Sequence, residues 1–205
     1  MNFFNMDSPL MKIGEKLTDI MLVNILMVIC SIPIITIGAS YTAMHYVLLK
    51  IHRDETGHIV QDYFHAFKIN FKDATIIWGC YLLFALFLGI DYLFIISKGI
   101  EFPIVFRCII YAITVVLCFS LTWVFILLSR YENSIKRTII NSLTIGIANL
   151  WKTIVMAILM VMPYLLLLIS PRSIPIVLLI GIAALTYLQT ALYDKIFIKI
   201  EQTTN

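Results

Sequence analysis

The chain has few charged residues. Lysine, arginine, aspartate and glutamate make up 13% of its 205 residues, whereas about 25% is usual for a soluble domain. Hydrophobic residues make up 61%, against a usual value of about 45–50%. The formal net charge of +3 is too small to indicate a nucleic-acid partner. This composition predicts an integral membrane protein, with the lipid bilayer as its surroundings and no separate soluble domain.

Site-forming cysteines and catalytic motifs are also lacking. The four cysteines lie inside apolar runs and form no C-x-x-C pair, so we expect buried thiols rather than disulfides or a zinc site. They are Cys30, Cys80, Cys108 and Cys118. Neither a Ser-His-Asp arrangement nor a G-x-S-x-G, P-loop or H-E-x-x-H motif is present. We therefore expect no enzymatic activity and no cofactor.

Long apolar runs separated by short charged connections fill most of the chain. A helix rises 1.5 Å per residue and the hydrocarbon core is about 30 Å thick, so about 20 residues cross it. The runs predict an all-α, polytopic membrane helix bundle that forms one domain over residues 1–205, with about five transmembrane helices. The predicted spans are residues 17–37, 74–96, 104–128, 153–170 and 176–193, with inner-face connections over residues 40–72 and 129–152.

The first apolar stretch, residues 17–50, is too long for one pass and too short for two. Pro33 removes a backbone donor, and Gly38 permits dihedral angles that end a helix. We predict one span kinked at Pro33, followed by a short helix from about residue 40 to residue 53. The alternative is a re-entrant pair of half-helices. The structural motif of this stretch comprises Asn24, Pro33, Thr36 and Gly38.

Two polar residues lie deeper in the predicted spans, Asn24 and Gln189. We expect them to form hydrogen bonds between helices, each of which typically contributes about 0.6 kcal/mol.

The basic residues predict the orientation in the cell membrane. Five spans place the termini on opposite sides, and lysine and arginine favour the cytoplasmic side. Ten of the fifteen basic residues follow the first, third and fifth spans. We therefore predict an external N-terminus and a cytoplasmic C-terminus, although Lys12 and Lys16 oppose this assignment.

Two amphipathic cytoplasmic helices are predicted, one in each inner-face connection. In the second, the apolar face comprises Ile135, Ile139, Leu143, Ile147 and Leu150. In the first, Phe64, Phe67 and Phe71 form an apolar stripe, which we interpret as a candidate docking face. Phe67 and Phe71 are expected to pack within the protein, and Phe64 is expected to stay available for lipid or a partner.

Two polar clusters are further candidates. Asp91 closes the second span and Arg107 follows the start of the third, so the two are expected to form an ion pair. His58, Asp62 and His65 share one helical face and have the chemistry of a zinc site. The same face is the solvated side of an amphipathic helix, and we favour that interpretation, with no metal bound.

Three segments resemble the signature of the YesL-like membrane proteins. The first comprises Asn24-Ile25-Leu26, residues 30–39 (CSIPIITIGA) and Thr42-Ala43. The second is Phe64-x-x-Phe67-Lys68-x-Asn70-Phe71-Lys72-x-Ala74-Thr75, followed by Trp78. The third, Asn141-Ser142-Leu143 with Asn149, is a weaker match.

The YesL-like proteins are uncharacterised bacterial integral membrane proteins, mostly from Gram-positive species. The resemblance implies an accessory role in carbohydrate ABC import, with importer permease subunits as partners. Two alternatives stay open: a small stand-alone transporter or channel with a path between the first two spans, and a membrane scaffold for a sensor kinase. The oligomeric state is open as well.

The first prediction concerns the histidines. Replacing His58 and His65 together by alanine should leave the melting temperature and function nearly unchanged, because their face is solvated. Metal analysis of purified protein provides the check. A stoichiometric zinc content that disappears in the double variant would show that the pair is a metal site.

Overall fold

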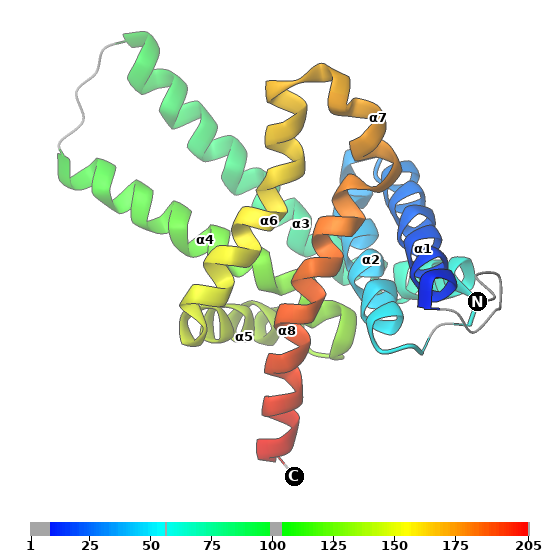
Figure 1. Cartoon of the computed structure of the whole chain (residues 1–205). Coiled ribbons are helices and arrows are strands. Elements are labelled where there is room, and N and C mark those ends of the chain that lie inside the picture. Colours follow the sequence, from blue (N-terminus) through cyan, green and yellow to red (C-terminus); the bar gives the residue numbers. More distant parts are fainter. Residues whose placement is uncertain (1–8, 56, 99–103, 205) are drawn as a thin grey trace.

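The computed structural model describes residues 9–55, 57–98 and 104–204, and within them the secondary structure is entirely helical (Figure 1). The elements are α1 (Pro9–Cys30), η1 (Ile34–Thr36), α2 (Ile37–His52), α3 (Ile59–Lys98), α4 (Ile104–Arg130), α5 (Ile135–Ala148), α6 (Leu150–Ile169), η2 (Pro171–Ser173), α7 (Ile174–Ile176), η3 (Val177–Gly181) and α8 (Ile182–Thr204). Five helical segments are long and apolar enough to cross a membrane: Ile34–His52, Ile59–Leu93, Arg107–Arg130, Leu150–Ile169 and Pro171–Gln202. The predicted all-α bundle is confirmed.

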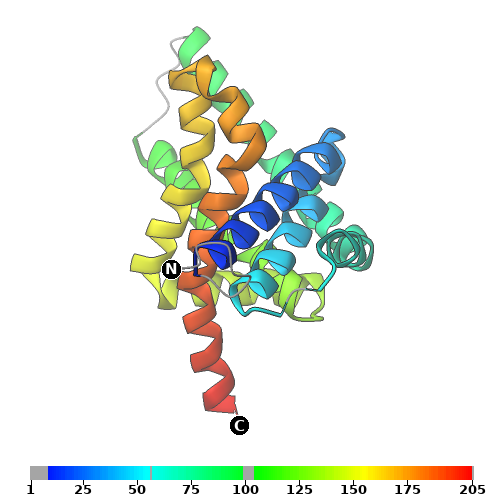
Figure 2. The ribbon, with the colours of Figure 1, turned by 45° about the vertical axis from the view of Figure 1, so that its right-hand side comes forward.

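The chain reverses direction after α1. The helix ends at Cys30, and α2 returns beside α1 (Figures 1 and 2). At the reversal the Thr36 hydroxyl donates to the carbonyl oxygens of Cys30 (2.6 Å) and Pro33 (2.7 Å). These bonds satisfy carbonyls that the end of a helix leaves without partners.

The predicted single span over residues 17–37, kinked at Pro33, is therefore wrong. A break caused by proline is compatible with either a kink or a reversal of the chain. In the structure the chain reverses, and residues of α3 contact it at that point. The Trp78 indole nitrogen donates to the Ile34 carbonyl oxygen at 2.8 Å. The alternative prediction, a re-entrant pair of half-helices, is closer to the structure, because α1 begins and α2 ends on the same side of the bundle.

Helix α2 forms the centre of the bundle. Twelve of its sixteen residues are buried, and α1, α3, α4 and α8 pack around it. Ala39, Ala43 and Val47 are completely buried in one hydrophobic cluster with residues of α1 and α3. Small side chains on a central helix let the neighbouring backbones approach closely, which is how membrane helices gain packing energy.

Gly38 is placed where α2 meets α3. A Cβ at this position would lie 2.7 Å from both the Ala74 carbonyl oxygen and the Trp78 Cβ. We expected Gly38 to end a helix. It is instead the second residue of α2. Its role is to permit the close approach of two backbones.

Asn24 joins α1 to an irregular part of the last membrane segment. Residues Val177–Gly181 form a π-helical turn, which alters the hydrogen-bonding pattern of the backbone. The buried Asn24 amide donates to the carbonyl oxygens of Val177 (3.2 Å) and Leu178 (2.6 Å) and accepts from the Ala183 amide (2.8 Å). One side chain thus satisfies polar groups on both sides of the turn.

Helix α5 packs at the lower end of the bundle through its small and polar face. Its buried residues are Thr138, Ser142 and Gly146, whereas Ile147 is 60% exposed. The Ser142 hydroxyl hydrogen-bonds the Ser120 hydroxyl of α4 at 2.7 Å. The predicted apolar stripe packs only in part: Ile135 and Ile139 are half-buried against the central hydrophobic cluster, whereas Ile147 and Leu150 are exposed. The small side chains give α4 and α5 their closest contact.

We predict that Gly38→Ala destabilises the protein. The added methyl group must displace backbone atoms of α3, and such overpacking typically costs about 1–3 kcal/mol. The matched control is Gly79→Ala on α3, since nothing lies within 4 Å of a Cβ built there. The melting temperature in detergent should fall clearly for Gly38→Ala alone. Equal melting temperatures for the two variants would contradict the close approach described here.

Candidate functional site

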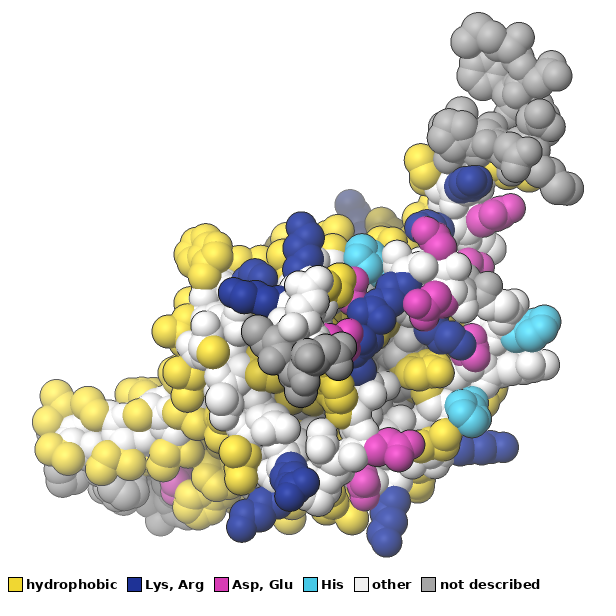
Figure 3. All heavy atoms as spheres, turned by 90° about the horizontal axis from the view of Figure 1, so that it is seen from below, with side chains coloured by type: hydrophobic (Ala, Val, Ile, Leu, Met, Phe, Trp, Pro, Cys, Tyr) yellow, Lys and Arg dark blue, Asp and Glu magenta, His cyan; other side chains and the backbone are white. Residues whose placement is uncertain are grey.

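Charged side chains gather at the lower end of the bundle, which Figure 3 shows from below. Lys16 of α1 lies 2.8 Å from Asp54, just after α2. The Lys16 ammonium donates a hydrogen bond to the Asp54 carboxylate and lowers the pKa of that group below its usual value. Arg53 reaches Asp194 of α8 at 2.6 Å. These pairs link the start of α1, the end of α2 and the lower part of α8.

The start of α1 and the end of α8 lie toward the same end of the bundle (Figure 1). The prediction of termini on opposite sides depended on residues 17–37 being a single pass, and the reversal after Cys30 removes that basis. Lys12 and Lys16, which opposed the earlier assignment, belong to the same end as the other basic residues. Among all lysines and arginines, Lys98, Arg107 and Arg172 are at the other end, on α3, α4 and η2.

The phenylalanine stripe lies on the proximal segment of α3 (residues 59–72), which runs across the lower half of the bundle before the helix rises (Figure 1). Phe67 packs against the central hydrophobic cluster, and its ring stacks on Tyr63 with the centroids 6.4 Å apart. Phe64 and Phe71 are each 40% exposed. Phe67 thus packs as expected and Phe64 stays accessible.

The expectation that Phe71 packs within the protein is wrong. The buried residues of this part of α3 are Tyr63, Ala66, Ala74 and Ile77, which follow one another at helical spacing. Phe71 lies beside that stripe, on the same side as Phe64. The inward face is therefore centred on these four residues, with Phe67 at its edge.

The outward side of the segment combines aromatic and basic residues. We define the α3 face as Val60, Phe64, Lys68, Phe71 and Lys72, all of which are exposed. Two accessible rings beside two lysines suit a surface at the boundary between lipid and water, where a neighbouring protein can cover the rings and the ammonium groups stay hydrated.

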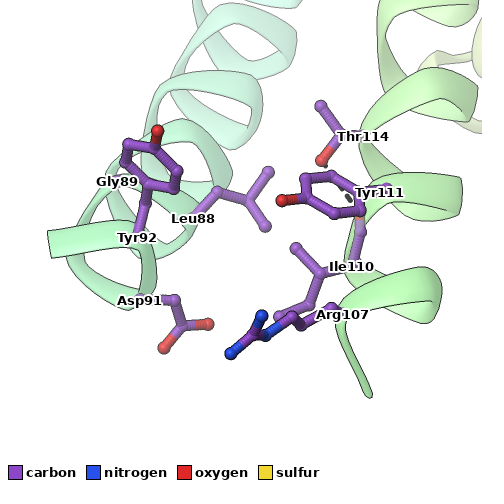
Figure 4. Close-up of a pocket in the computed structure, with 8 residues that line it drawn as sticks. All are labelled: Leu88, Gly89, Asp91, Tyr92, Arg107, Ile110, Tyr111 and Thr114. Carbon is purple, nitrogen blue, oxygen red and sulfur yellow. Dashed lines mark hydrogen bonds between the residues drawn. The ribbon is translucent and has the colours of Figure 1, made fainter. Parts of the chain in front are cut away.

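Asp91 and Arg107 face each other across the space between α3 and α4, near the end opposite the charged one (Figure 4). The predicted ion pair does not form in the structure, since no salt bridge of 4.0 Å or less joins these two described residues. The buried Nε of Arg107 finds no hydrogen-bond partner among the described residues. The two helices diverge toward this end, which keeps the charged groups apart (Figure 1).

The histidines are dispersed. His58 and His65 are exposed, while Asp62, which shares their face, lies 2.9 Å from Lys50 of α2. In the described part of the chain, no three His, Cys, Asp or Glu residues come together as a metal site would require. The metal-free interpretation of this face stays a prediction.

Buried polar contacts between the helices were the largest omission of the sequence reasoning. The Gln189 amide donates to the Met156 carbonyl oxygen at 2.8 Å, which joins α8 to α6 as a deep glutamine suggested. The Trp123 indole donates to the Thr153 hydroxyl at 2.9 Å, and nothing in the sequence singled out that pair.

His45 was not recognised as a core residue either. It is 1% exposed, with its ring edge-on to Tyr41 at 4.7 Å.

Comparison with known proteins gives one match. Residues 20–92 match the family described as "Protein of unknown function, DUF624", to which the YesL-like proteins belong. The matched region extends from the middle of α1 through α2 and most of α3, and so includes the reversal and the α3 face. No curated protein and no solved structure matches the chain.

Proposed function

We propose that this chain is a non-enzymatic, multi-pass membrane protein that docks a second membrane protein on the α3 face. The observation that carries the proposal is the exposure of Phe64 and Phe71 on a helix that continues directly into a membrane span. Fully burying an exposed phenylalanine is worth about 1.5–3 kcal/mol, and each of these two rings is 40% exposed. Covering the exposed part of both rings can therefore contribute about 1–2 kcal/mol to the affinity of a partner that is already confined to the membrane.

The partner that we propose is a permease subunit of a carbohydrate ABC importer, which makes the chain an accessory component of sugar uptake. The YesL-like resemblance supports this choice, and the α3 face lies inside the matched residues 20–92. A sensor kinase would use the same surface, so the identity of the captured protein decides between the two partners.

Docking is preferred to transport by the chain alone because the space between α1 and α3, which contain the first two predicted spans, is filled. Val23 and Met27 of α1 lie in one buried hydrophobic cluster with Ala74 and Ile77 of α3. A path between these helices, which a transporter or channel built on the first two spans needs, would require this cluster to open.

We further propose that both termini are cytoplasmic. Positive residues favour the cytoplasmic side of a membrane, and all lysines and arginines except Lys98, Arg107 and Arg172 belong to the end that holds the termini. The α3 face then lies on the cytoplasmic side.

Cysteine labelling in intact cells tests this orientation. In a background without the four native cysteines, an impermeant maleimide should label Arg172→Cys directly. Lys12→Cys and Lys136→Cys should react only after the membrane is permeabilised. Labelling of Lys12→Cys in intact cells would show that the N-terminus is outside.

Affinity capture tests the docking surface. The double variant Phe64→Ala/Phe71→Ala should recover about tenfold less importer permease from detergent extracts, because the burial energy still available on the two rings together corresponds to about that factor. The matched control is Phe84→Ala/Phe87→Ala, a second exposed pair on the same helix.

The control should recover the permease as the unchanged chain does. Undiminished recovery with the Phe64/Phe71 variant would remove the α3 face as the docking surface. Capture of a sensor kinase in place of the permease would keep the surface and replace the partner.

A further inference from the structure

The space between α3 and α4 is largely apolar and carries two charged side chains at one end. The charged end has a volume of about 310 Å³ and is lined in part by Asp91, Arg107 and Tyr111 (Figure 4). A second cavity of about 360 Å³ follows it along the same two helices, lined in part by Trp78, Ala85 and Leu117. Leu88 and Thr114 line both cavities, so the two adjoin. We call the whole the α3–α4 groove.

The charged residues of the groove need partners. In the described structure no salt bridge joins Asp91 to Arg107, and the buried Nε of Arg107 has no hydrogen-bond acceptor. Ionisable groups within a membrane segment are costly without partners and are functional candidates for that reason. A carboxylate and a guanidinium held apart across a cavity suit a ligand that carries both an anion and a cation.

The dimensions of the groove fit an amphiphile. From Tyr81 to Asp91, α3 rises about 15 Å, which is about half the thickness of the hydrocarbon core. The apolar part therefore has the length of a lipid chain in one leaflet, and the charged end lies where the headgroup of that leaflet begins. Side chains from both helices line the apolar part, as Leu82 of α3 and Leu121 of α4 illustrate.

We propose that the α3–α4 groove binds one zwitterionic phospholipid whose headgroup carries a primary amine, of the phosphatidylethanolamine type. Arg107 donates paired hydrogen bonds to the phosphate, as guanidinium groups do. The Asp91 carboxylate accepts a hydrogen bond from the ammonium, and an acyl chain lies between α3 and α4. An anionic headgroup without an amine would leave Asp91 without a partner, and a quaternary ammonium has no hydrogen to donate.

Native mass spectrometry of the purified chain tests the proposal. The protein is equilibrated with an equimolar mixture of phosphatidylethanolamine and phosphatidylglycerol, and the lipid retained after release from the micelle is identified. One phosphatidylethanolamine per chain should be retained in preference. Asp91→Asn should reduce that preference about tenfold or more, because it removes the charged partner of the ammonium that only phosphatidylethanolamine carries. Arg107→Gln should lower the retention of both lipids by a similar factor, because it removes the hydrogen bonds to the phosphate that the two lipids share.

Two further variants keep the test decisive. Arg172→Gln removes an exposed charge at the same end of the bundle, outside the groove, and should leave the preference unchanged. Ala85→Phe fills the apolar part while keeping both charges, and should abolish retention even if the charge variants fold poorly. Equal retention of the two lipids, an unaltered preference in the Asp91 variant, unaltered retention in the Arg107 variant, or full competition by soluble phosphoethanolamine would each overturn the proposal.

Discussion

The burial of α2 is the constraint on which the rest of the structure depends. A helix with twelve of its sixteen residues buried needs neighbours on all sides, and the chain provides them by reversing after Cys30. The Thr36 hydroxyl and the Trp78 indole satisfy carbonyl oxygens at that reversal. Because Gly38 has no side chain, α3 can then pack directly on the backbone of α2. The shared end for both termini and the gathering of basic residues there follow from the same reversal.

Polar side chains join the outer helices to one another. Asn24 bonds to the π-helical turn before α8, Gln189 joins α8 to α6, and Trp123 joins α4 to the start of α6. In lipid an apolar side chain gains little by moving from acyl chains into the protein, so small residues and hydrogen bonds carry the specificity. Exposed apolar side chains remain on α3, α4 and α6, and it is on α3 and α4 that we propose the protein and lipid partners to bind.

The sequence was sufficient for the fold class and for the approximate positions of most long helices, since apolar length alone determines which segments can cross a bilayer. It was insufficient at Pro33, because a proline and a glycine mark a break without showing whether the chain bends or turns back. The contacts that accompany the reversal come from Trp78 and Ala74, far along the chain. The error in the positions of the termini followed from that one choice.

The candidate site was predicted in part, for a related reason. Helical periodicity placed Phe64, Phe67 and Phe71 on one side of α3, but it could not show that only Phe67 of the three packs against the bundle, beside the buried Ala66 and Ala74. On α5 the same reasoning selected the apolar stripe, whereas the structure buries Thr138, Ser142 and Gly146. Periodicity identifies faces, and in a membrane protein the face that packs is often the one with small residues.

The distance between the start of α1 and the loop after α2 tests the account most directly. Spin labels at Lys12 and Glu55, in a cysteine-free background, can be measured by pulsed electron paramagnetic resonance in reconstituted membranes. The reversal predicts a distance well below the thickness of the hydrocarbon core, about 30 Å, while the control pair Lys12 and Arg172 should be separated by about that thickness or more. A Lys12–Glu55 distance of about 30 Å or more would mean that α1 and α2 do not form a hairpin, and the arrangement built on the burial of α2 would be wrong.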